Sequence, residues 1–138
     1  MTDKTTIYQS LMEAAVSARE FSYSPYSGYR VGAALLGKSG KVYTGCNVEN
    51  AGYTPTNCAE RTAVFKAVSE GERAFAAIAV AGGAGDRIDP ACTPCGVCRQ
   101  VLAEFCAPDT PVIMGTPENV RVMTLGELLP FAFTKENL

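Results

Sequence analysis

The sequence predicts an α/β fold, a three-layer α/β/α sandwich around a mixed five-stranded sheet. Helical and extended apolar patterns alternate along the 138 residues without a linker, a repeat or a low-complexity segment. The length suits one domain, and 47% of the residues are hydrophobic, enough to form a core without disulfide or metal cross-links. We therefore expect residues 1–138 to form a single domain with nine main elements: helix, two strands, helix, strand, helix, two strands and helix.

The first half of the chain predicts one helix and a hairpin. Apolar residues recur at helical spacing over 7–21, and the segment 22–29 contains a proline and a glycine that end the helix. The apolar run 31–36 predicts a buried strand. A Gly-Lys-Ser-Gly turn at 37–40 connects this strand to a second one over 42–46.

The second half predicts three more helices and three more strands. Apolar residues fall on one side of a helix over 58–69. Pro94 suits the first position of a third helix, and Thr124 with Glu127 has the capping-box spacing that begins a short last helix. Three apolar runs predict strands: 76–81, 111–114 and 120–123.

Charge and composition narrow the class of partner. The 12 basic and 14 acidic residues give a net charge of −2 without a basic cluster, so we expect neither a nucleic acid nor a membrane surface as partner. The pattern shows neither a signal peptide nor a run long enough to span a bilayer. Six cysteines in so apolar a chain favour free thiols in the reducing cytoplasm over a disulfide scaffold.

Three cysteines and one carboxylate predict a metal site that performs chemistry. Cys58 lies two residues before Glu60, while Cys95 and Cys98 lie three apart at a predicted helix start, where the helix terminus favours thiolates. Three protein ligands leave the fourth tetrahedral position of a zinc ion open, as catalytic sites require. The chain contains no histidine, so acid–base chemistry near pH 7 must fall to a carboxylate, and Glu60 is the candidate.

Other interpretations of these residues remain open. Asn57 and Glu60 also have capping-box spacing, in which Glu60 would only bind the Asn57 backbone amide. Cys92 could complete a closed structural site of four cysteines. Arg61 and Arg99 closely follow the cysteines, and we expect them to donate hydrogen bonds that offset the charge of three thiolates, although both could instead be solvated.

These motifs resemble the cytidine deaminase family, specifically its small homotetrameric members that act on free nucleosides. The similarity runs nearly end to end and is carried by five segments: 26–35, 45–51, 58–63, 94–101 and 127–130. It implies a cytidine deaminase-like sandwich with one zinc ion per chain, held by Cys58, Cys95 and Cys98. Many deaminases have histidine in place of Cys58, so the chain matches an all-cysteine subgroup.

The resemblance also implies a reaction and a set of substrate contacts. The reaction is the hydrolytic deamination of cytidine and deoxycytidine, serving pyrimidine salvage, with Glu60 moving protons between water, the ring N3 and the departing amine. In the family, the residues matching Asn47 and Glu49 bind the ribose, and the backbone matching Ala59 contacts the base. Tyr29 replaces a phenylalanine that packs beside the base in some relatives.

The resemblance further implies a homotetramer with composite active sites. In tetrameric relatives the phenylalanine matching Phe133 reaches into the pocket of a neighbouring subunit. Without the resemblance, the apolar segment 128–133 could simply pack on its own domain. The Asn-Val-Glu segment at 47–49 could likewise be an exposed loop after a strand.

Two other classes of function fit the same zinc motif. One is a deaminase of the same fold with another substrate, either a polynucleotide base or a cytosine-bearing nucleoside antibiotic. The negative net charge argues against a polynucleotide, and an antibiotic would need a differently shaped pocket around Asn47 and Tyr53. The other class is a non-enzymatic zinc module used for assembly.

Overall fold

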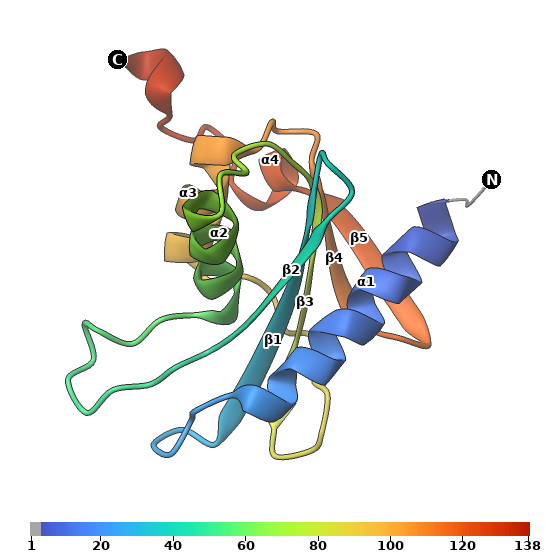
Figure 1. Ribbon diagram of the computed structural model, residues 1–138, viewed down its shortest axis with the longest axis vertical. Coiled ribbons are helices and arrows are strands. Elements are labelled where there is room, and N and C mark those ends of the chain that lie inside the picture. The colour runs from blue at the N-terminus through green and yellow to red at the C-terminus, as the bar shows by residue number, and fades with distance from the viewer. Residues whose placement is uncertain (1–3) are drawn as a thin grey trace.

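The structure, a computed structural model, describes residues 4–138 and arranges them in three layers (Figure 1). Helix α1 (Lys4–Ala18) covers one face of a five-stranded sheet, and α2 (Ala59–Ser69) and α3 (Gly96–Phe105) cover the other. The strands are β1 (Tyr29–Gly37), β2 (Val42–Cys46), β3 (Phe75–Ala84), β4 (Pro111–Thr116) and β5 (Asn119–Thr124). Three short helical segments complete the chain: η1 (Arg19–Phe21), α4 (Leu125–Leu128) and η2 (Lys135–Asn137). The predicted sandwich is confirmed.

The sheet is mixed, with the strand order β2-β1-β3-β4-β5. Only the β3–β4 pair is parallel among the described strands, with Ile78 opposite Val112, and the other neighbours are antiparallel. A parallel pair needs a crossover connection, and α3 provides it between β3 and β4. Cys95 and Cys98 lie at the start of α3 and are therefore part of this crossover, on the face of the sheet that α2 also covers.

Two apolar cores lie on opposite faces of the sheet. One joins the inner sides of α2 and α3 to residues such as Leu35, Val80 and Met114, and the other joins α1 to Ala34 and Ile113. Close approach of α2 to β2 depends on a glycine, because a Cβ at Gly45 would lie 2.5 Å from the Ala59 carbonyl oxygen. This contact fixes the first turn of α2 directly on the sheet.

The observed elements differ from expectation mainly at their ends. Strand β1 begins at Tyr29 and β3 continues to Ala84, further than the apolar runs alone indicated. The expectation that Pro94 opens α3 is wrong, because the helix begins at Gly96 and Cys95 is its N-cap. The Cys95 sulfur accepts a hydrogen bond from the Cys98 N–H at 3.4 Å, a capping contact that proline could not supply. The predicted capping box that begins α4 is confirmed.

Candidate metal centre and adjoining pocket

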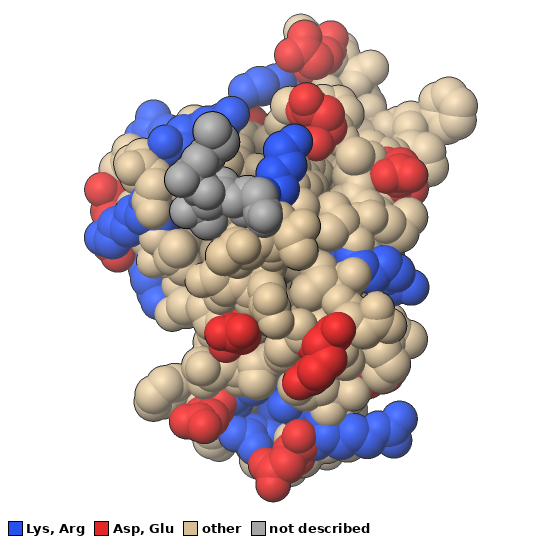
Figure 2. Space-filling view, turned by 90° about the vertical axis from the view of Figure 1, so that its right-hand side faces the viewer, with Lys and Arg blue, Asp and Glu red and all other residues tan. Residues whose placement is uncertain are grey.

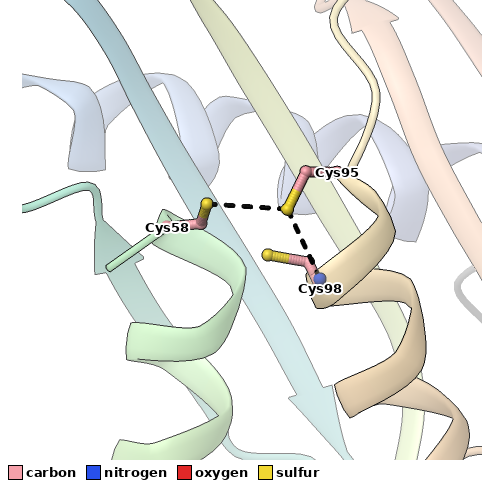
Figure 3. Close-up of side chains that lie close together, drawn as sticks. All are labelled: Cys58, Cys95 and Cys98. Carbon is pink, nitrogen blue, oxygen red and sulfur yellow. Dashed lines mark hydrogen bonds between the residues drawn. The ribbon is translucent and has the colours of Figure 1, made fainter. Parts of the chain in front are cut away.

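Three cysteines from two helix starts converge in the layer that contains α2 and α3 (Figure 3). Cys58 is the N-cap of α2, Cys95 is the N-cap of α3, and Cys98 lies in the first turn of α3. Their sulfur atoms all lie within 4.8 Å of one another. The Cys58 and Cys95 sulfurs are 3.8 Å apart. The structure thus brings together the cysteines that the sequence spacing selected.

This arrangement fits a tetrahedral zinc ion with an open position. Zn–S bonds of about 2.3 Å in a tetrahedral site separate two sulfurs by about 3.8 Å, as Cys58 and Cys95 are separated here. Within residues 4–138, the only possible metal-binding group of His, Cys, Asp or Glu side chains consists of these three cysteines. Cys92 is not a member, which argues against the closed site of four cysteines. The three thiols therefore fit one catalytic-type zinc ion per chain.

Arg61 offsets negative charge at the sulfur cluster. Its Nη2 donates to the Cys58 sulfur at 3.2 Å, as the sequence predicted. Hydrogen bonds from Cys98 and Arg61 hold the pKa of Cys58 below its ordinary value in spite of burial. The Arg61 Nε is buried without a hydrogen-bond partner, which costs free energy. The contact of the same guanidinium with the Cys58 sulfur offsets part of this cost. Cys58 is therefore suited to the thiolate form, which is the form that binds a metal.

Glu60 lies beside the cluster in the first turn of α2 and is almost completely buried, with 3% of its surface exposed. Burial raises its pKa to about 7, and the nearby Cys58 charge acts in the same direction. The alternative role as a helix cap lacks its hydrogen bond, since the Asn57 N–H donates to the Val48 carbonyl at 2.9 Å. A buried carboxylate that exchanges its proton near neutral pH is suited to proton transfer.

The expectation that Arg99 donates hydrogen bonds to the cysteine sulfurs is wrong, because its guanidinium donates to other acceptors. Its Nε donates to the Pro94 carbonyl at 2.7 Å, its Nη1 to the Leu128 carbonyl at 2.7 Å, and its Nη2 to the Thr93 hydroxyl at 3.3 Å. Arg99 thus ties the loop before Cys95 to the end of α4. The spacing along α3 could not reveal this, because the acceptors come from a loop and from a helix 29 residues away.

A pocket of about 410 Å³ adjoins the cluster, within the range of small-molecule sites. Cys58, Glu60 and Cys95 line it together with the predicted substrate residues Tyr29 and Asn47. Glu49 also lines it, as do several residues that the sequence analysis did not assign to a substrate site: Ser27, Val31, Thr56, Asn57, Ala91, Cys92 and Thr93. Only folding brings these segments together, so no spacing along the chain could have marked them.

Asn47 and Glu49 are held in place by neighbouring segments. The Asn47 side chain accepts from Ser22 Oγ at 2.5 Å and from the Val31 N–H at 2.9 Å, and it donates to the Tyr29 carbonyl at 2.8 Å. The Glu49 N–H donates to the Tyr23 carbonyl at 2.8 Å. A freely exposed loop would lack such contacts. These hydrogen bonds fix the backbone of the segment, and both residues line the pocket.

Tyr29 and Cys92 form part of the pocket wall over β3. A Cβ at Gly82 would lie 2.8 Å from the Cys92 sulfur and 3.1 Å from the Tyr29 ring, so both side chains pack directly on the strand backbone. Burial and a hydrogen bond with Cys92 raise the pKa of Tyr29, which keeps its hydroxyl protonated. Cys92 therefore belongs to the pocket rather than to the metal ligands.

The other two predicted substrate residues lie outside this lining. Ala59 is fully buried against β2, and Phe133 lies on the C-terminal segment with 62% of its surface exposed. The described residues that line the pocket include neither of them. The Phe133 carbonyl accepts from the Gln100 Nε2 at 2.8 Å, which fixes this segment to α3. The Phe133 ring is thus available to a neighbouring molecule.

The comparisons with known proteins agree with this geometry. The family model of the cytidine and deoxycytidylate deaminase zinc-binding region matches residues 5–114. The chain belongs to this deaminase family. A cytidine deaminase of Halalkalibacterium halodurans is 53% identical over 94% of the chain and 96% of its own length. A crystal structure of cytidine deaminase from Burkholderia pseudomallei has a TM-score of 0.83 at 48% identity, covering 96% of this chain and all (100%) of that one.

A more distant relative is named for a different substrate. A blasticidin-S deaminase of Bacillus cereus is 32% identical over 78% of this chain and 79% of its own length. The deaminase family thus includes proteins named for nucleosides and for an antibiotic. Family membership fixes the fold and the zinc-binding region, and the pocket residues must decide the substrate.

Proposed function

We propose that the protein catalyses the hydrolytic deamination of cytidine and deoxycytidine to uridine and deoxyuridine, with release of ammonia. The observation that carries the proposal is a buried carboxylate, Glu60, next to three clustered thiols in a small-molecule pocket. The names of the most similar relatives support the same activity. The expected metabolic role is pyrimidine salvage.

The residues of the site divide the chemistry among them. Cys58, Cys95 and Cys98 would hold zinc, which supplies Lewis-acid activation of water at the open position. Glu60 would accept one proton from the attacking water and deliver it to N3 of the pyrimidine. It would then move the second water proton from the C4 hydroxyl to the amine, so that the C–N bond breaks, ammonia leaves and the C4 carbonyl forms. The hydrogen bond that Arg61 donates to Cys58 favours the thiolate form of that residue.

The nucleoside is bound by groups on the pocket wall. Glu49 and Asn47 bind the ribose, Tyr29 packs beside the base, and the backbone of Ala59 contacts the base edge. Support comes from the pocket lining, which combines polar groups with an aromatic ring and the catalytic carboxylate. Arg99 takes part indirectly, by fixing the loop that precedes Cys95.

We further infer a homotetramer whose sites are completed by Phe133 of a neighbouring subunit. Phe133 and Phe131 are exposed to 62% and 106%. They belong to the C-terminal part of the chain, whose end projects beyond the body of the molecule (Figure 1). Tyr53, 89% exposed, offers a further large apolar surface. Aromatic side chains are enriched at protein–protein interfaces, so these exposed residues support contacts with a neighbouring subunit. Each chain, 1–138, would contribute a single deaminase domain.

The proposed partners are limited to small molecules and other copies of the chain. On the face shown in Figure 2, acidic and basic side chains are interspersed, and the net charge is −2, which is unfavourable for nucleic acid. No described helix has the length and apolar character needed to cross a membrane. The six cysteines are free thiols, which supports a cytoplasmic location.

Ultraviolet absorbance tests the activity directly. Purified zinc-loaded protein is incubated with cytidine, deoxycytidine, free cytosine, single-stranded DNA and blasticidin S, and the absorbance change that accompanies deamination is followed. We expect rapid turnover of both nucleosides and far slower reaction of the others, because free cytosine has no ribose for Glu49 and Asn47 to bind. Faster reaction of blasticidin S than of cytidine would instead favour the antibiotic deaminase. No reaction with any substrate would favour the non-enzymatic zinc module.

A further inference from the structure

A tight turn between α1 and β1 holds the Glu49 carboxylate from one side. The Gly28 N–H donates to the Ser24 carbonyl at 3.0 Å, and Gly28 has a φ of +70°, a conformation that glycine adopts without strain. No atom lies within 4 Å of a Cβ built there, so glycine is needed for its backbone conformation and not for space. The turn directs the N–H groups of Tyr26 and Ser27 to the Oε1 of Glu49, at 3.0 and 3.1 Å.

The Ser27 side chain adds a third hydrogen bond and a link to the pocket wall. Its Oγ donates to the Oε2 of Glu49. The same oxygen accepts from the Tyr29 N–H at 2.9 Å. Ser27, Tyr29 and Glu49 all line the pocket. One hydroxyl group therefore sets the relative position of the residue expected beside the base and the residue expected on the ribose.

The Glu49 carboxylate keeps one acceptor site for a ligand. A carboxylate has about four lone-pair sites, and Oε1 of Glu49 uses two of them for backbone amides while Oε2 uses one for Ser27. Oε2 retains one site for a hydroxyl donor. The hydrogen bonds from Ser27 and the turn amides also hold the pKa of Glu49 below its usual value, so it is an ionised acceptor at neutral pH.

We propose that Ser27 is a positioning residue for ribose recognition, because its hydroxyl directs the remaining acceptor site of Glu49 towards one hydroxyl of the bound nucleoside. This inference rests on the proposed nucleoside deaminase function and adds a residue to it. Ser27 reaches the ligand through the Glu49 side chain, whereas it contacts only the backbone N–H of Tyr29. Removing its hydroxyl should therefore matter far more for ligands that carry the ribose hydroxyl than for ligands that lack it.

The test compares cytidine with 2′,3′-dideoxycytidine, which lacks the 2′- and 3′-hydroxyls and keeps the 5′-hydroxyl, so it applies to a ribose hydroxyl at position 2′ or 3′. In Ser27→Ala we expect the KM for cytidine to rise about tenfold, the effect of one hydrogen bond to a charged group. The KM for dideoxycytidine should change by less than about twofold, and kcat for either by less than about threefold. Ser27→Thr retains a hydroxyl and should largely restore the cytidine KM. Equal losses with both nucleosides would mean a merely structural role and overturn the inference.

The chain contains a matched control at the turn between β1 and β2. The N–H and Oγ of Ser39 donate to Glu72 at 2.9 and 2.6 Å, the same chemistry outside the pocket lining. Ser39→Ala should leave both KM values unchanged. A rise in the cytidine KM equal to that of Ser27→Ala would also overturn the inference, since the effect would then be general.

Calorimetry of product binding separates this inference from the proposed function. Uridine should bind Ser27→Ala about tenfold more weakly than it binds wild type, whereas 2′,3′-dideoxyuridine should bind the two proteins alike. If wild type turns over no cytidine but Ser27→Ala selectively weakens uridine binding, the proposed deaminase function is wrong and the role of Ser27 holds. If wild type is active and both products weaken equally, only the role of Ser27 is wrong. A wild type that binds neither product contradicts both.

Discussion

Glu60 and Glu49 line the same pocket in opposite environments, and the difference supports the different tasks that we propose for them. Glu60 is 3% exposed, and its burial raises its pKa to about 7. Glu49 accepts hydrogen bonds from Ser27 and the Tyr26 amide, which lower its pKa. At neutral pH the first can exchange a proton while the second stays a charged acceptor. In the function that we propose, the surroundings rather than the side-chain type determine which carboxylate transfers protons and which binds the nucleoside.

The largest expected effect comes from neutralising the proton-transfer carboxylate. Glu60→Gln keeps the size of the side chain but cannot accept a proton, so kcat for cytidine should fall by at least about 10²-fold. Zinc content, measured by elemental analysis, and the melting temperature should stay close to wild type. An unfolded variant whose refolded fraction is fully active would show that Glu60 is only structural.

Neutralising the binding carboxylate should affect a different kinetic constant. Glu49→Gln removes the charged acceptor, so the KM for cytidine should rise about ten- to hundredfold, as expected for losing a hydrogen bond to a charged group. Because the proton-transfer residue is intact, kcat at saturation should change far less than in Glu60→Gln. Steady-state kinetics of both variants checks this contrast. A Glu49→Gln variant that loses kcat with an unchanged KM would reverse the assignment.

Phe133 extends the comparison to the binding group that we propose a neighbouring subunit contributes. Phe133→Ala should raise the KM about tenfold or more, since stacking on a base contributes about 1–3 kcal/mol. The exposed end residue Leu138 provides a control, and Leu138→Ala should be neutral. Mixing Phe133→Ala with Glu60→Gln subunits should restore some intact composite sites and raise activity above either variant alone. A fully active monomer in sedimentation would contradict the shared site.

The smallest effect is expected at Cys92, which lies in the pocket wall but outside the sulfur cluster. Cys92→Ser should retain stoichiometric zinc and change kcat/KM by less than about threefold. Cys98→Ser is the matched comparison, because it removes a sulfur of the cluster and should lose zinc. Zinc loss from Cys92→Ser would support the closed site of four cysteines.

The metal cluster could be predicted because its signals are local. Cys95 and Cys98 lie three residues apart at the start of α3, a spacing that puts both side chains on one face, and Cys58 lies two residues before Glu60 at the start of α2. The apolar periods likewise predicted all five strands in chain order. Which strands pair, and that the parallel pair is β3 with β4, came only from the structure.

The remaining features depend on contacts between distant segments. Arg99 reaches the Leu128 carbonyl, and Ser27 reaches Glu49 across 22 positions, so helical or strand spacing carries no sign of either contact. The error at Pro94 had a local cause, because Cys95 supplies the N-cap through its own sulfur. Sequence patterns therefore predicted which cysteines cluster beside Glu60 better than they predicted the contacts that hold these residues in place.

Deamination in ¹⁸O-labelled water tests the central claim most directly. Wild type and Glu49→Gln, each saturated with cytidine, should release one ammonia per uridine and place one ¹⁸O atom in the product, as detected by mass spectrometry. Glu60→Gln should form labelled uridine at least about 10²-fold more slowly under the same conditions. Uridine without the label, or label incorporation at the wild-type rate in Glu60→Gln, would contradict hydrolysis assisted by this carboxylate.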